Sequence, residues 1–257
     1  MARTILVLTL QVSLCWLAPQ AAQAADGANL NVIGFSADMR YFAFEQYGIE
    51  DGSGFPYSEV FVLDLERNAW VKSSPIRERS ENDEARLGAV RAASASKATP
   101  LLKSLFIDEP AEILASNQAT EVLADRNHVQ FDRWFRSSSL GSKPETNGSA
   151  NEGRYELSVE ANPMALPSNC TPENGLTYGF TLKLRSFKTG ATSVLHKDDA
   201  IPASRRCPKG YDIQAIVVTT GYPKIDRLVA IIGVYSFGFE GNDRRFIAIP
   251  FTIDPGS

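Results

Sequence analysis

Runs in which apolar and polar residues alternate recur along most of the chain. Residues 155–159 and 180–185 alternate without a break, which gives an extended segment one buried and one solvent-facing side. Residues 40–44 and 59–65 are rich in aromatic and β-branched side chains, which are also typical of strands. The pattern therefore predicts a mainly β protein.

Two segments in the last third of the chain are almost continuously apolar. Residues 213–218 and 228–234 therefore indicate interior strands that are covered on both faces. Residues 246–249 are also apolar and precede Pro250. Because proline has no amide donor, this position suits the end of a strand or the edge of a sheet.

After the first strands the composition becomes rich in Ala, Glu, Arg, Leu and Lys. This composition predicts a helical insertion at about residues 77–123. Its apolar residues recur at the spacing of one helix face. Pro100 is expected to kink or restart this helix. Residues 110–115 fit a second short helix with a proline in its first turn. Residues 137–153, nearly free of large apolar side chains, predict a flexible loop.

Taken together, the elements predict an α+β chain dominated by antiparallel sheets, forming one domain over residues 25–257. The sheets are expected to form either an incomplete propeller-like arrangement or a sandwich. Residues 38–62, 155–187 and 226–248 share an order of strand, loop and strand. This similarity fits either an internal repeat or ordinary hairpins, because no fixed period is present.

The first 24 residues have the order of a secretory signal peptide. Arg3 gives a positive start, residues 5–18 are mostly apolar, and residues 22–24 form a small-residue cleavage site. The apolar core is too short to cross a membrane, and no later stretch is long enough. The pattern predicts a mature chain that begins at Ala25 and is exported to the periplasm or secreted.

The charge balance is mildly acidic, which excludes one class of partner. The formal net charge is −4, and loss of Arg3 with the signal makes it one unit more negative. A nucleic-acid-binding protein would be expected to carry a basic stripe instead. The pairs at 205–206 and 244–245 are expected to be solvated surface arginines. The sequence identifies no particular partner, although an envelope component fits the predicted address.

Export also changes the cysteine count. Cys15 leaves with the signal, so that Cys170 and Cys207 remain in an oxidising compartment. Both lie in turn-rich segments and predict a structural disulfide. A redox pair would normally have the C-x-x-C spacing, which is absent.

Two glycine-rich acidic loops are the main candidates for a binding site. The first spans residues 48–58 and the second residues 236–243. Aromatic faces with a few polar groups often line ligand clefts, although the same residues also serve core packing. The candidate ligand-binding residues are Tyr47, Glu50, Asp51, Tyr57, Phe239, Glu240 and Asp243.

No cofactor is predicted, with calcium as the possible exception. The acidic loops offer hard oxygen ligands on glycine-rich backbone, but neither matches the calcium loop of EF-hands. His128 and His196 have no second ligand at zinc-binding spacing and are expected at the edge of a packed segment and in an exposed turn. No nucleophile elbow, Walker loop or dinucleotide fingerprint is present.

Two resemblances add to these interpretations. Residues 35–44, followed by 62–65, resemble one blade of the β-propeller repeats of secreted bacterial proteins, with Ala37 and Met39 in place of the usual proline and glycine. Over nearly the whole mature chain, the segments 34–38, 45–58, 227–234 and 239–241 resemble a bacterial family of predicted secreted proteins, domain of unknown function 2259. That resemblance implies export from a Gram-negative cell and brings no catalytic residue.

The sequence thus favours a non-catalytic periplasmic protein that binds a ligand or associates with the envelope. This hypothesis rests on the export signal and on the lack of a catalytic motif. The alternative is a hydrolase that acts on an envelope polymer with carboxylates from the two acidic loops.

Overall fold

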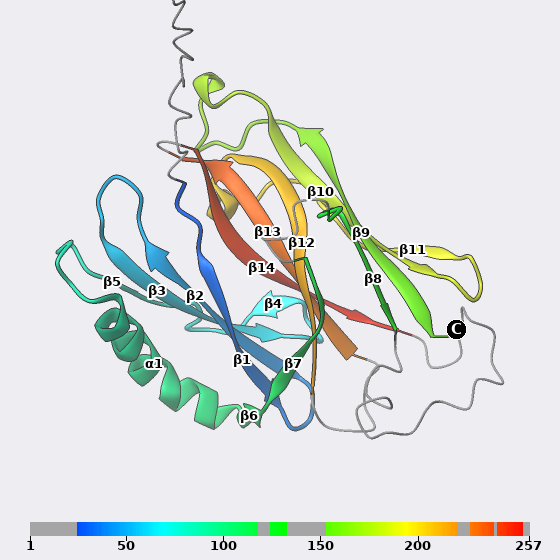
Figure 1. Ribbon diagram of the computed structural model, residues 1–257, viewed down its shortest axis with the longest axis horizontal. Coiled ribbons are helices and arrows are strands. Elements are labelled where there is room, and N and C mark those ends of the chain that lie inside the picture. The colour runs from blue at the N-terminus through cyan, green and yellow to red at the C-terminus, as the bar shows by residue number, and fades with distance from the viewer. Residues whose placement is uncertain (1–24, 118–123, 133–152, 220–226, 239–240, 254–257) are drawn as a thin grey trace, which may run out of the picture.

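The computed structural model describes residues 25–117, 124–132, 153–219, 227–238 and 241–253 (Figure 1). The predicted signal peptide, nearly all of the predicted loop at 137–153, and Phe239 and Glu240 lie outside these residues. Among the described residues, no helix combines the length and the apolar character needed to cross a membrane.

The strands form three antiparallel sheets, which confirms the prediction of a mainly β chain with a helical insertion. The helix-side sheet contains β1 (Asn29–Ser36), β2 (Tyr41–Ile49), β3 (Pro56–Asp64), β4 (Ala69–Trp70), β5 (Ile76–Arg79) and β6 (Ile107–Glu109). The central sheet contains β7 (Ala111–Ser116), β12 (Pro208–Thr219), β13 (Arg227–Phe237) and β14 (Asn242–Thr252). The disulfide-side sheet contains β8 (His128–Asp132), β9 (Arg154–Met164), β10 (Thr177–Ser186) and β11 (Thr192–Lys197).

The central sheet packs between the other two sheets, as Figure 1 shows. Along β13, Ala230 and Ile232 pack in one core with the disulfide-side sheet. Val229 and Ile231 alternate with them and pack in a second core with Phe42 and Phe44 of the helix-side sheet. Each of the valine, isoleucine and phenylalanine side chains contributes about 1.5–3 kcal/mol on burial. The predicted two-sided burial of residues 213–218 and 228–234 is therefore confirmed.

The outer edge of the central sheet is β14, and other parts of the chain cover its first half. The Arg244 N–H donates to the Asp26 carbonyl at 2.8 Å, and the Ala28 N–H donates to the Arg244 carbonyl at 3.1 Å. The Phe246 N–H donates to Gln46 Oε1 at 2.8 Å. Pro250 is an even number of residues from Arg244 and Phe246, so its main-chain nitrogen also faces the open edge. Because proline has no N–H, the edge offers no donor there. The predicted edge position of Pro250 is confirmed.

Helix α1 (Leu87–Ser104) covers the outer face of the helix-side sheet (Figure 1). It buries Val90, Ser94 and Ala98, and its last turns pack near the apolar cluster of Ala43, Val62 and Ile107. The helix continues through Pro100 rather than restarting there.

The predicted second helix at residues 110–115 is wrong. Residues 111–116 form β7, in which Ala115 pairs with Ile216 of β12. Pro110 stands where the chain leaves β6 of the helix-side sheet and enters the central sheet. A proline fits the first turn of a helix, but hydrogen-bonded pairing with the buried strand β12 outweighs this local preference. Among the described residues of the predicted insertion at 77–123, helical structure is therefore confined to residues 87–104.

The predicted disulfide between Cys170 and Cys207 is present, with Cα atoms 5.8 Å apart. It joins the loop before β10 to the residue before β12, and so links the disulfide-side sheet to the central sheet. Closing a loop of this length contributes about 4 kcal/mol in the chain-entropy model.

Helix α1 is held to the sheet by a charged contact as well as by apolar packing. Arg91 donates from Nε and Nη2 to the two carboxylate oxygens of Glu45, at 2.9 and 2.7 Å. Ser58 and Asn31 also donate to this carboxylate at 3.0 Å. Burial opposes ionisation of Glu45, but these hydrogen bonds outweigh it and lower the pKa of Glu45 below its ordinary value.

We expect Glu45 to make the stability of the fold depend on pH. Because its pKa is lower in the folded chain, its contribution is present above the ordinary pKa and is lost as the pH falls through the folded value. Glu45→Gln should reduce the free energy of unfolding at pH 7 by about 1–3 kcal/mol. The difference from wild type should shrink toward pH 3 in urea denaturation.

Glu81→Gln is the matched control, because Glu81 is exposed and lies 3.6 Å from Arg79. It should change stability by less than about 0.5 kcal/mol at either pH. An equal loss of stability in Glu45→Gln at pH 7 and pH 3 would contradict this account.

Candidate functional site

Polar residues gather in two groups, one at each end of β3. We call these groups the loop end and the cleft end. The loop end contains the described parts of the two acidic loops together with Asp26 and Arg245. The cleft end contains residues 65–66 after β3, Arg227 at the start of β13 and residues 250–252 at the end of β14.

Asp26 is the centre of the loop end. Its buried carboxylate contacts the guanidinium group of Arg245 and accepts a hydrogen bond from the Tyr57 hydroxyl at 3.1 Å. Arg245 also lies over the Tyr57 ring, 4.6 Å from its centroid. Burial, and then the neighbouring Asp26, raise the pKa of Tyr57. These contacts tie the first described residues to β3 and β14.

The carboxylates predicted for binding lie next to guanidinium groups. Glu50 accepts two hydrogen bonds from Arg79, both at 2.8 Å, and these contacts lower the pKa of Glu50. Asp243 lies 3.2 Å from Arg206. Burial, and then the charge of Asp26, raise the pKa of Asp243.

The structure thus brings Glu50, Tyr57 and Asp243 toward one region but does not bring all predicted residues there. Tyr47 lies on the helix-covered face of β2, where Arg91 stacks 3.6 Å above its ring. Asp51 Oδ2 is shielded from solvent and has no hydrogen-bond partner among the described residues.

The prediction of solvated arginine pairs is wrong for two members. The side chains of Arg205 and Arg245 are only 10% and 22% exposed. Each lies against a buried carboxylate, which offsets the cost of removing its charge from water. Asp26 and Arg245 were missed because they are far apart in the sequence and neither lies in a recognisable motif.

His196 is half-buried rather than in an exposed turn. It stacks on Phe180 at 4.6 Å and contacts Asp198 at 2.9 Å. Asp198 also accepts a hydrogen bond of 2.6 Å from Arg205. No hydroxyl or thiol is hydrogen-bonded to His196 among the described residues, so this cluster braces the disulfide region instead of forming a nucleophilic triad.

The part of the chain that the structure describes contains no preformed metal-binding cluster. Within those ranges, no three His, Cys, Asp or Glu side chains are grouped in a metal-binding arrangement. Glu50, one of the oxygen ligands considered for calcium, faces Arg79 and Ser53. Histidine His128 lies at the start of β8 and contacts Asp125 at 2.8 Å.

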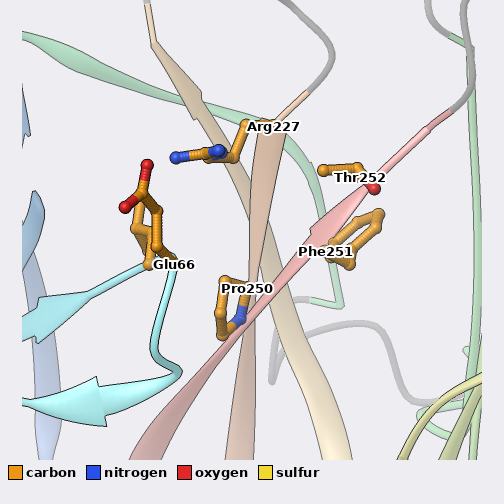
Figure 2. Close-up of a pocket in the computed structure, with 6 residues that line it drawn as sticks. Glu66, Arg227, Pro250, Phe251 and Thr252 are labelled. Carbon is orange, nitrogen blue, oxygen red and sulfur yellow. The ribbon is translucent and has the colours of Figure 1, made fainter. Parts of the chain in front are cut away.

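The cleft end has a hollow with a volume of about 350 Å³. Figure 2 shows the side chains of Glu66 and Arg227 on the same side of β14, pointing toward each other beside Pro250. The Phe251 side chain points to the opposite side of the strand. The lining residues are Leu65, Glu66, Arg227, Pro250, Phe251 and Thr252.

The two charges that border the cleft do not form an ion pair with each other. Arg227 donates from Nη1 to the Met39 carbonyl at 2.9 Å, which fixes the guanidinium group at the opening. The Glu66 carboxylate lies 4.0 Å from Arg40 Nε, while Arg40 also contacts Asp64 at 3.4 Å. No local sequence motif marks this site, because its charged groups come from turns and strand ends far apart in the chain.

We expect the loop-end contacts to act as a structural clamp. Asp26→Asn removes one charge of a buried pair and leaves Arg245 without its partner, so it should reduce the free energy of unfolding by about 3 kcal/mol or more. Asp108→Asn, at an exposed position of β6, should change it by less than about 0.5 kcal/mol. Chemical denaturation measures both, and equal stabilities would refute the clamp.

Comparison with known proteins connects this fold to a family. A family model described as predicted secreted protein (DUF2259) matches residues 43–252, which include β3 through β14 and most of β2. No curated protein matches the chain. The match includes strands of all three sheets and covers more than half of the chain, and the chain therefore belongs to this family of predicted secreted proteins, domain of unknown function 2259.

Proposed function

We propose that this secreted protein is a non-catalytic binding protein of the periplasm and that the cleft end holds its ligand. The observation that carries the proposal is the pair of opposite charges at the cleft. Glu66 and Arg227 border a hollow of about 350 Å³ without pairing with each other. Specific small-molecule sites commonly combine such a hollow with a few polar groups that fix orientation.

The contacts at the loop end argue against the hydrolase alternative. Hydrolysis of a sugar polymer needs two carboxylates, one of them protonated as the acid. Asp243 has a raised pKa, but its neighbour Asp26 binds Arg245, and Glu50 of the other acidic loop binds Arg79. These ion pairs stabilise the fold and occupy two of the loop-end carboxylates that the hydrolase would need.

The periplasmic address rests on three features. The predicted signal peptide directs export, the family is described as predicted secreted proteins, and the Cys170–Cys207 bridge suits an oxidising compartment. Association with the envelope follows from this address, since any ligand or partner would be encountered there. No cofactor is part of the proposal.

The proposal predicts binding without turnover. The mature chain from Ala25 should be mixed with separate panels of amino acids, sugars, nucleosides and dicarboxylates, and its unfolding temperature recorded. At least one panel should raise that temperature, and Arg227→Gln should abolish the shift. Asp243→Asn, at the loop end, is the control and should retain the shift.

The same preparation should be tested for hydrolysis of nitrophenyl glycosides and muropeptides. We expect no product above the buffer rate. Turnover that disappears in the folded double variant Asp51→Asn and Glu240→Gln would instead establish the hydrolase and overturn the binding proposal.

A further inference from the structure

We propose that the ligand of the cleft is a small zwitterion, namely a free α-amino acid with an apolar side chain. This inference rests on the proposed binding function and assigns its ligand class. The geometry behind it is the arrangement of Arg227, Glu66 and Pro250 around one hollow.

Arg227 is the group that receives the ligand carboxylate. Its Nη1 is held by the Met39 carbonyl, and its other N–H groups have no hydrogen-bond partner among the described residues. A guanidinium group presents several donors in one plane, which match the two oxygens of a carboxylate. Because Arg227 is anchored by the β1–β2 turn, binding requires little additional ordering of this side chain.

Glu66 is the group that receives the ammonium. Its carboxylate is exposed, and its nearest cation, Arg40, is 4.0 Å away, beyond hydrogen-bond distance. Asp64 cannot take this role, because its carboxylate already accepts the main-chain N–H groups of Glu66 and Arg67 and contacts Arg40. Glu66 is thus the carboxylate among the described lining residues, and no hydrogen bond to Arg40 occupies its oxygens.

The two charges together select against simpler ligands. A ligand with only a carboxylate would bring a second negative charge to Glu66, and an amine alone would face Arg227. A ligand with both groups satisfies both sides of the opening at once. Pro250 supplies apolar surface beside the charged groups, and the volume suits a small molecule.

The test compares amino acids with analogues that lack one charge. Isothermal titration calorimetry should detect binding of at least one of alanine, leucine and phenylalanine to the mature chain. For leucine, the matched analogues are 4-methylpentanoate, which lacks the ammonium, and 3-methylbutylamine, which lacks the carboxylate. Each analogue should bind at least about tenfold more weakly than leucine, since one charge-assisted hydrogen-bonded contact is lost.

Removing a charge from the cleft should weaken binding in the same way as removing its partner charge from the ligand. Glu66→Gln and Arg227→Gln should each weaken binding of the amino acid about tenfold or more. Glu66→Gln should leave binding of 4-methylpentanoate no weaker, and Arg227→Gln should leave binding of the amine no weaker. Arg67→Gln is the control, because this exposed arginine lies on the same turn outside the cleft lining, and it should bind the amino acid as wild type does.

The outcomes separate this inference from the function on which it rests. If none of the three amino acids binds but a sugar or nucleoside does, the zwitterion is wrong and the binding function stands. If the analogues bind as tightly as leucine, the two-charge recognition is wrong. If no compound of any panel binds, both proposals fail.

Discussion

Burial of the central sheet on both faces is the constraint on which the rest of the structure depends. The alternating side chains of β13 belong to two separate cores, so neither outer sheet can be removed without exposing apolar surface. The helix-side sheet then requires its own cover, which α1 provides. The order of layers, from helix through three sheets, follows from this requirement.

The same constraint explains why polar contacts are concentrated at the ends and edges. The edge of β14 is covered by residues 26–28 and Gln46, and Asp26 anchors that cover through Arg245 and Tyr57. Toward its other end, β14 lacks a donor at Pro250 and remains beside the cleft. The loop end therefore stabilises the sandwich, whereas the cleft end retains charged groups that can meet a ligand.

Burial marks the sequence directly, and the strands were predictable for that reason. Residues 155–159 and 213–218 carried one-sided and two-sided apolar patterns, and the structure confirms both. The helix predicted at residues 110–115 was wrong because the proline is a local signal and carries no information about pairing with β12. The site was harder to predict, since Glu66 and Arg227 come to line one cleft only because two sheets stack. No local sequence pattern indicates that proximity.

The central claim is that ligand recognition occurs at the cleft end and that the loop end is structural. Two-dimensional ¹⁵N–¹H NMR of the mature chain, recorded while leucine is added, tests this most directly. The account predicts that the amide signals of Glu66, Arg227 and Thr252 shift with ligand concentration, while those of Glu50, Tyr57 and Asp243 stay in place. Shifts confined to the loop-end residues would contradict it.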